Sequence, residues 1–315
     1  MTRKYNIRHE TRYRYSADVV HAHHLLHLVP RPAPYQQCLE HEIAIEPAAH
    51  RSVSELDAFG NPLLRLELAQ PHRELGVVSL MQIEVHSRPT LDVETSEPWE
   101  KVRDSFAYHG AWPSRQQLDA ARFRHESPHV RIKQAFTDYA AECFEPGRPI
   151  LACALALTTR LHADITYAPG ETGIGTPATE VIETRRGVCQ DFAHLMIACL
   201  RSRGLPARYV SGYLRTNGKL VGDGASHAWV SVWSPRYGWI EFDPTNGCFA
   251  ATDHVAVAWG RDFGDVSPLR GVILGGGKHQ LSVTVLVEPA DADGADGADA
   301  AAMAARNLST SAERT

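Results

Sequence analysis

The sequence of 315 residues predicts an α+β fold, in which a β-sandwich-like domain precedes a core with one helix packed on an antiparallel sheet. Through about the first 90 residues, apolar and polar residues alternate with a period of two, which is typical of half-buried strands. Residues 189–200 carry an apolar stripe of helical period, and residues 226–243 return to strand-like alternation. A chain of this length exceeds what one hydrophobic core usually organises, so two domains are expected.

The N-terminal region reads as a series of short strands. The sequences PRPAP and DAFGNP supply the turn residues between them. The alternating runs lie at 5–15, 39–47, 63–69 and 76–85. Several short strands with regular turns predict a sandwich-like domain, and no group of residues suited to catalysis lies within it.

Composition shifts divide the chain into four parts. The N-terminal β domain spans 1–92, and a mixed, proline-punctuated stretch at 93–130 is interpreted as the linker and the start of the core. The core itself is assigned to 131–289, where helical patterning appears first. The remainder, 290–315, is a low-complexity tail of Ala, Asp and Gly and is expected to be disordered.

Charge and cysteine usage exclude several classes of partner. The chain has 32 Lys and Arg against 37 Asp and Glu, and the tail contributes five of the acids and two of the arginines. The remaining surface is nearly balanced, so neither nucleic acid nor membrane is expected as a partner. No run approaches the about 18 apolar residues of a membrane span, and MTRKYNIRHE lacks the apolar segment of a secretory signal. Six scattered cysteines without a CxxC pair then predict reduced thiols and a cytoplasmic protein. The oligomeric state is left open.

The stretch HAHHLLHL concentrates four histidines, His21, His23, His24 and His27. Imidazoles two or four residues apart could share a face and bind a metal ion. No carboxylate or cysteine adjoins them in the sequence to complete a ligand set. Histidines on a partly exposed strand or loop are therefore favoured over a metal site, and no metal is expected.

Cys189 stands at the beginning of the predicted helix. Downstream, Phe192, Leu195, Met196, Cys199 and Leu200 form one apolar stripe, and RSRG followed by Pro206 is a typical helix end. Asp191 lies in the first turn, where an acidic side chain suits the helix dipole. Backbone N–H groups at such a position stabilise a thiolate. Cys199, in the middle of the stripe, is expected to be an inert core residue.

A histidine and an aspartate follow on two predicted strands joined by the turn SPRYG. If the hairpin is symmetric about Pro235, His227 and Asp243 lie directly opposite each other on one face. A register slip of two residues leaves them diagonal, still within reach of each other. A carboxylate in that place fixes the tautomer of the imidazole and stabilises its charged form.

Each of these residues also has a structural interpretation. Asp243, which precedes Pro244, could begin a turn, and His227 could be an ordinary sheet histidine. Glu241 shares the face of His227 and is a second candidate for the orienting carboxylate. The joint occurrence of a cysteine at a helix start, a histidine and an aspartate favours a catalytic triad of Cys189, His227 and Asp243.

At these residues the chain resembles the transglutaminase-like superfamily, which has a papain-like cysteine fold. The motifs are GVCQDFAHLMIACLRSRGLPARYVSGYL, SHAWVSVW and GWIEFDPTNG, in the order of the family. DAFGNPLLRLEL resembles the N-terminal β domain of bacterial members, and residues 260–289 resemble their closing strands. The resemblance implies Cys189 as nucleophile, His227 as base and Asp243 as the residue that orients it, within a catalytic core at 131–289.

The implied reaction is acyl transfer at an amide bond through a thioester, with a peptide or protein amide as substrate and no cofactor. Hydrolysis, as in a cysteine protease or amidase, is favoured. Transamidation by a protein-glutamine cross-linking enzyme requires the same residues, and a non-catalytic binding protein on this fold is the third alternative. The intact set of three residues argues against the last.

Overall fold

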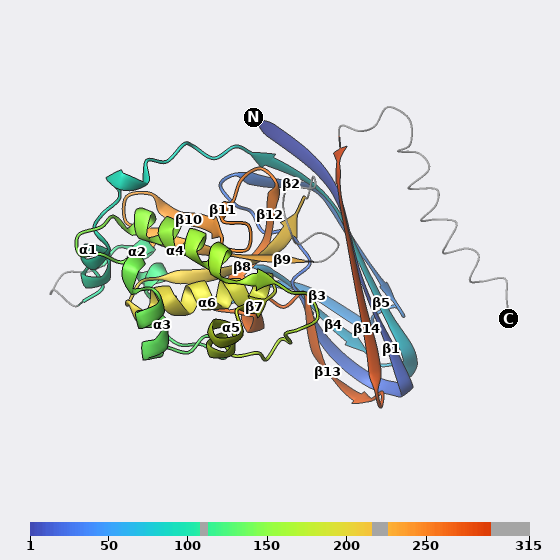
Figure 1. Cartoon of the computed structure of the whole chain (residues 1–315). Helices are drawn as coiled ribbons and strands as arrows, with labels where there is room; N and C mark the ends of the chain where they lie inside the picture. Colours follow the sequence, from blue (N-terminus) through green and yellow to red (C-terminus); the bar gives the residue numbers. More distant parts are fainter. Residues whose placement is uncertain (108–112, 216–225, 291–315) are drawn as a thin grey trace.

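Two large antiparallel sheets, one two-stranded parallel sheet and a group of helices are present in a computed structural model, which describes residues 1–107, 113–215 and 226–290 (Figure 1). All but the first residue of the tail predicted at 290–315 lies outside the described residues. The mixture of helices and antiparallel sheets agrees with the predicted α+β class.

The first sheet is built around one long bent strand. Its main path has the order β2-β5-β1-β4-β3, and two strands from the end of the chain, β13 and β14, also pair with β1. The register of β1 shifts between Arg14 and Val19, so its first half pairs with β5 and β14 and its second half with β4 and β13. The predicted sandwich-like domain is therefore one curled sheet. Its strands are β1 (Thr2–Leu26), β2 (Gln36–Glu46), β3 (Arg51–Leu56), β4 (Pro62–Leu68), β5 (His72–His86), β13 (Leu269–Gly275) and β14 (His279–Pro289).

The range 131–289 that was assigned to the core from the sequence includes β13 and β14. By pairing, β13 and β14 belong to the first sheet, where each adds to β1. Local alternation identifies such strands but does not say which sheet they join, because that depends on a free strand edge elsewhere in the chain.

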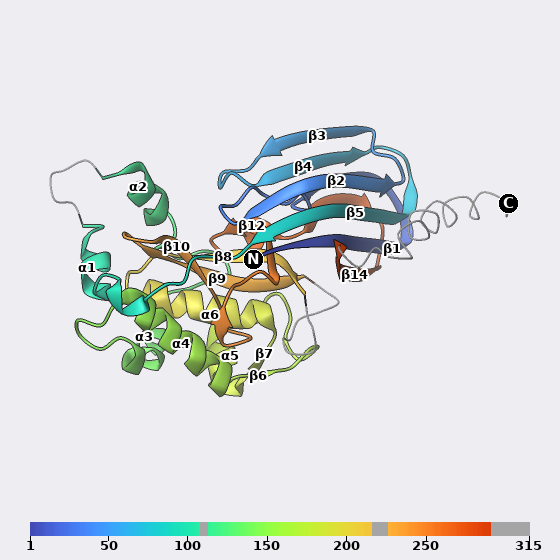
Figure 2. The same cartoon turned by 90° about the horizontal axis from the view of Figure 1, so that it is seen from above.

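The core sheet has the order β11-β10-β9-β8-β12, and helices cover one of its faces (Figure 2). Its strands are β8 (Ala207–Leu214), β9 (His227–Ser234), β10 (Gly238–Asp243), β11 (Cys248–Phe249) and β12 (His254–Gly260). The central helix is α6 (Cys189–Ser202), and α4 (Ile150–Asp164) shares a hydrophobic core with it. The remaining elements are η1 (Val93–Thr95), α1 (Trp99–Asp104), α2 (Arg115–Ala121), α3 (Gln134–Tyr139), η2 (Ala141–Cys143), β6 (Thr166–Tyr167), α5 (Ala178–Thr184), β7 (Arg186–Gly187) and α7 (Phe263–Val266).

The first sheet packs against the core sheet on the side away from the helices (Figure 2). Tyr5 and Ile83 belong to the same buried cluster as Tyr213 and Val255. Polar contacts reinforce this packing, since the side chain of Gln36 accepts from the backbone N–H of Ala256 at 2.8 Å and donates to its carbonyl at 2.7 Å. The N-terminal region therefore packs on β8 and β12 of the core sheet.

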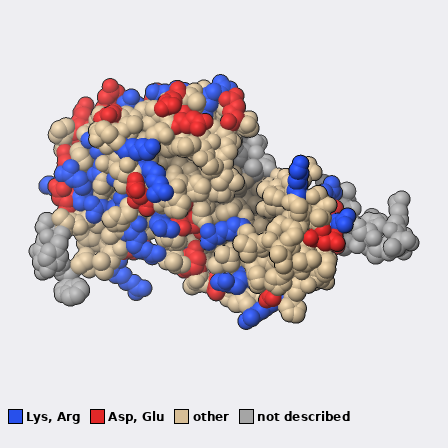
Figure 3. All heavy atoms as spheres, turned by 90° about the horizontal axis from the view of Figure 1, so that it is seen from below, with Lys and Arg blue, Asp and Glu red and all other residues tan. Residues whose placement is uncertain are grey.

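Within the described ranges, no helix is both long enough and apolar enough to cross a bilayer. The face drawn in Figure 3 carries basic and acidic side chains together, in keeping with the close balance of 32 basic and 37 acidic residues.

Candidate active site

Helix α6 begins at Cys189, as the sequence predicts, and its first turn is fixed by Asp191. The buried carboxylate of Asp191 accepts a hydrogen bond from the backbone N–H of Val188 at 2.8 Å and from the hydroxyl of Thr172 at 2.6 Å. Gly187 makes room for it, because a Cβ there would lie 2.8 Å from the Cβ of Asp191. Asp191 thus satisfies one of the backbone groups that a helix start leaves free, and it sets the position of Cys189.

The two cysteines of α6 differ in environment. The predicted stripe is buried, and so is every residue from Asp191 to Arg201, because helices pack on one side of α6 and the core sheet on the other. Cys199 is fully buried, and burial raises the pKa of its thiol well above the ordinary value. Cys189 is only half-buried. Only the first residue of the helix therefore combines a thiol with partial access.

The hairpin of β9 and β10 has a different register from the symmetric one about Pro235. Trp239 pairs with Trp233 and Phe242 with Val230, so the centre lies at Arg236 and the pairing has slipped by two residues. The turn explains the slip, because Gly238 closes it with a φ of 72°, a conformation that favours glycine. His227 and Asp243 are therefore diagonal neighbours, the alternative arrangement that the sequence allows.

His227 and Asp243 form a buried hydrogen-bonded pair. Nε2 of His227 lies 2.8 Å from Oδ2 of Asp243, and both side chains are inaccessible to solvent. Burial alone raises the pKa of Asp243, but the charge and hydrogen bond of His227, together with the hydrogen bond of His254, outweigh it and hold that pKa well below its usual range. The carboxylate is therefore ionised when it meets the imidazole.

Cys189 also affects the pKa of the His227 imidazole. Burial alone lowers the pKa of His227, but Asp243, together with the nearby Cys189, raises it to about 10. Because Asp243 occupies Nε2, the nitrogen left to exchange a proton with the thiol is Nδ1, which has no hydrogen-bond partner within the described residues. The structure thus brings together the three residues that the sequence singled out.

Asp243 has further partners that the sequence does not predict. Nε2 of His254 lies 3.1 Å from Oδ2 of Asp243, and the amide of Asn246 donates to the same oxygen at 2.7 Å. The other oxygen accepts from the backbone N–H groups of Thr245 and Asn246 at 3.0 and 3.2 Å. The sequence TNG after Asp243 could have indicated the turn that supplies these donors. No local signal points to His254, which comes from β12.

Glu241 does not orient His227. One of its oxygens accepts from Nε1 of Trp229 at 3.0 Å and from Arg88 at 2.7 Å. The ring of Trp229 packs against both histidines, with its centroid 6.0 Å from that of His227 and 5.3 Å from that of His254. Glu241 therefore holds the indole that packs beside both imidazoles.

Two groups in the described part of the chain combine histidines with a carboxylate in metal-binding proximity. One is His227, Asp243 and His254, in which Oδ2 of Asp243 already accepts three hydrogen bonds. The other is His21, His23 and Glu67 in the first sheet. The remaining two histidines of the HAHHLLHL stretch are both buried, and His27 contacts Asp57.

Comparisons with known proteins match both halves of the chain. The model of the transglutaminase-like superfamily matches residues 137–244, and that of the bacterial transglutaminase-like N-terminal region matches residues 5–84. Uncharacterized proteins of Mycobacterium tuberculosis and Mycobacterium bovis are 38% identical over 307 residues, which cover 93% of this chain and 95% of theirs.

Two further matches carry functional names. A protein-glutamine gamma-glutamyltransferase of Pseudomonas aeruginosa is 32% identical over 127 residues, which cover 38% of this chain and 19% of that protein. The crystal structure of a candidate cysteine protease from Cytophaga hutchinsonii superposes with a TM-score of 0.71 at 20% identity, covering 94% of this chain and 93% of the other. At 20% identity, the match to the Cytophaga hutchinsonii structure shows a shared fold.

Proposed function

Because the chain belongs to the transglutaminase-like superfamily, we propose that it is a cysteine-dependent enzyme that hydrolyses peptide or related amide bonds through a thioester. One observation carries this proposal. The buried pair of His227 and Asp243 has its remaining imidazole nitrogen available to Cys189, at the start of a helix. A nucleophile, a base and a residue that orients the base are the parts that covalent acyl transfer requires.

The first half of the proposed reaction forms the thioester. With the proton on Nδ1 of His227, the thiolate of Cys189 attacks the amide carbonyl carbon, and the C–N bond breaks as His227 gives that proton to the leaving amine. The backbone N–H of Cys189 lies in the first helical turn, where N–H groups have no acceptor within the helix. It can therefore donate to the oxyanion of the tetrahedral intermediate.

The second half releases the acid. His227, now neutral at Nδ1, takes a proton from water as the water oxygen attacks the thioester carbonyl. The C–S bond breaks, which returns Cys189 as a thiolate beside a protonated imidazole. Asp243 remains ionised throughout and holds the Nε2 proton of the ring.

Transamidation is the second candidate function, and the Pseudomonas relative favours it. That relative is named a protein-glutamine gamma-glutamyltransferase, although the match spans only 19% of it. Both reactions form the thioester and differ in the molecule that then attacks it. Water attacks it in hydrolysis, and a primary amine attacks it in transamidation. The same three residues serve both.

A peptide library incubated with and without a primary amine tests the proposal. We expect cleaved peptides in both incubations by mass spectrometry, and amine-adducted products if transamidation is the reaction. Cys189→Ala is expected to abolish either product. Cys38→Ala removes another half-buried thiol, on β2, and is expected to leave activity unchanged. Full activity of Cys189→Ala would rule out both functions.

A further inference from the structure

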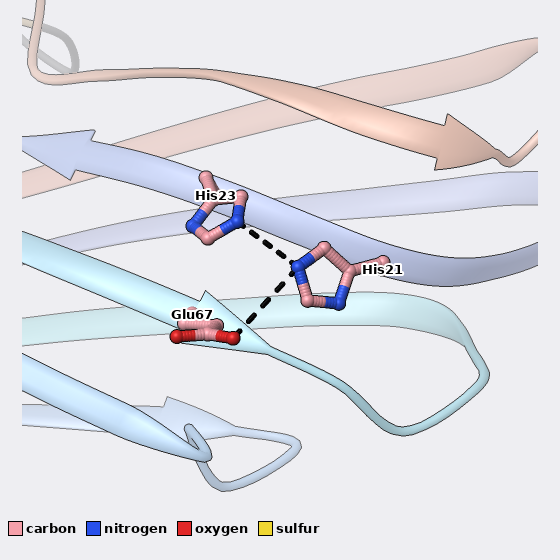
Figure 4. A group of neighbouring side chains, drawn as sticks. All are labelled: His21, His23 and Glu67. Atoms are coloured by element: carbon pink, nitrogen blue, oxygen red, sulfur yellow. Dashed lines mark hydrogen bonds and ion pairs between the residues drawn. The ribbon is translucent and has the colours of Figure 1, made fainter.

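The histidines of the HAHHLLHL stretch divide between the two faces of β1. His24 lies on the interior face and is 4% exposed, whereas His21 and His23 lie on the outer face, two residues apart. Their Nε2 atoms are 3.0 Å from each other (Figure 4). The two imidazoles therefore point their Nε2 atoms toward each other on the outer face of the strand.

A carboxylate from the neighbouring strand completes the group. Glu67 of β4 pairs directly with His23 of β1, on the same face. Its Oε1 lies 3.8 Å from Nε2 of His21, and the three ligand atoms all lie within 4.8 Å of one another (Figure 4). Glu67 is far from the histidines in the sequence and is brought to them by strand pairing.

The three side chains have few competing contacts. At 3.8 Å the approach of Glu67 to His21 is too long for a hydrogen bond. Arg51, opposite Glu67 on β3, makes no ion pair with it among the described residues. The side chains of His21 and Glu67 are 39% and 29% exposed, so an ion can reach them from solvent.

The spacing suits a zinc-type ion. Zinc binds histidine nitrogen and carboxylate oxygen at about 2.0–2.2 Å, so two ligand atoms of a tetrahedral site lie about 3.4 Å apart. Nε2 of His21 lies 3.0 Å from Nε2 of His23 and 3.8 Å from Oε1 of Glu67, and these two distances lie on either side of that value. The imidazole that donates its Nε2 proton in the histidine pair needs only to move that proton to Nδ1 for both Nε2 atoms to be ligands.

We propose that His21, His23 and Glu67 form a binding site for a zinc-type divalent cation, with solvent supplying the remaining coordination. The ion ties the second half of β1 to β4, at the part of the sheet where β1 has already bent away from β5. The proposal is independent of the proposed function, because all three ligands belong to the first sheet and the candidate active site belongs to the core.

Metal titration of the full chain with its thiols reduced tests the proposal. We expect isothermal titration with Zn²⁺ to show one equivalent, with affinity weakened at least about tenfold in each of His21→Ala, His23→Ala and Glu67→Gln. His86→Ala is the matched control, because His86 lies 3.3 Å from Glu84 in the same sheet but belongs to neither of the possible metal-binding groups found among the described residues. It is expected to bind like the parent protein.

Cobalt(II) binding to the unmodified chain gives a readout that does not depend on any variant folding. Ligands of this site predict visible d–d bands without the near-ultraviolet charge-transfer band of thiolate ligation. A thiolate band would place the ion at a cysteine and overturn the assignment. Equal Zn²⁺ affinities of the parent, His21→Ala and His23→Ala would overturn it as well.

Discussion

His254 donates a hydrogen bond from Nε2 to Oδ2 of Asp243, the oxygen that also meets His227. The tautomer follows from the other ring nitrogen, since Nδ1 of His254 accepts from the backbone N–H of Ala251 at 3.2 Å and so carries no proton. The proton is therefore on Nε2, which acts as the donor. We interpret His254 as a positioning residue that keeps the carboxylate ionised and aimed at His227.

Replacing His254 tests this role. We expect His254→Phe, which keeps a ring but removes the donor, to lower kcat on the order of tenfold, because a hydrogen bond to a charged group contributes about 1.5–3 kcal/mol. KM should change little, since His254 lies behind Asp243. His254→Gln retains an N–H donor and should recover part of kcat. Equal kcat values for the Phe and Gln variants would contradict the hydrogen-bond role.

Selective alkylation distinguishes Cys189 from the other five thiols. Burial is the largest factor that raises the pKa of each of the five, to about 12 for Cys153 and Cys248. Because the thiolate is the reacting form, these cysteines should react slowly with iodoacetamide near neutral pH. We expect mass spectrometry of the folded chain to find Cys189 modified first. Faster modification of the half-buried Cys38 would argue against activation of Cys189.

The parts of the site that the sequence predicts are those encoded locally. The helix start at Cys189 and the face shared by His227 and Asp243 follow from periods of 3.6 and 2. The register does not, because it depends on whether Pro235 or Arg236 stands at the centre of the turn, and the φ of Gly238 decides that.

Long-range pairing accounts for what the sequence did not predict. His254 reaches Asp243 because β12 pairs with β8, and Glu67 reaches His23 because β4 pairs with β1. The addition of β13 and β14 to the first sheet has the same origin. Alternation shows which face of a strand is buried, but the identity of its neighbour depends on the whole topology.

Gly212 on β8 is expected to be essential for the packing beside the site. A Cβ there would lie 2.1 Å from the carbonyl oxygen of Val255 and 2.5 Å from Cη2 of Trp229, whose ring packs against both histidines. Since neither backbone nor buried indole can move aside freely, Gly212→Ala should lower the free energy of unfolding by roughly 2–3 kcal/mol. Urea denaturation measures this. Gly175→Ala is the matched control, because nothing lies within 4 Å of the added Cβ, and a similar loss there would refute the steric explanation.

The buried pair of His227 and Asp243 predicts a pH-dependent contribution to stability. Folding raises the pKa of His227 from 6.5 to about 10, so the folded chain holds this proton more tightly than the unfolded chain. The stabilisation is therefore fully present below about pH 6.5 and is lost as the pH rises towards 10. The lowered pKa of Asp243 affects stability at acidic pH. Its contribution to the free energy of unfolding is present above the ordinary pKa of 3.8 and is lost as the pH falls below that value.

Urea unfolding of the parent and of His227→Gln, at about pH 6 and about pH 9.5, measures this contribution. The difference in unfolding free energy between the two proteins should shrink at the higher pH by at least about 1 kcal/mol, because one pKa unit corresponds to about 1.4 kcal/mol. Titrating groups that do not interact with His227 are common to both proteins and cancel in the comparison. His125→Gln, the same substitution at an exposed residue outside the pair, is the control. A difference for His227→Gln that stays constant or grows with pH would mean that the imidazole is neutral beside Asp243, and the thiolate–imidazolium form of the proposed mechanism would then be untenable.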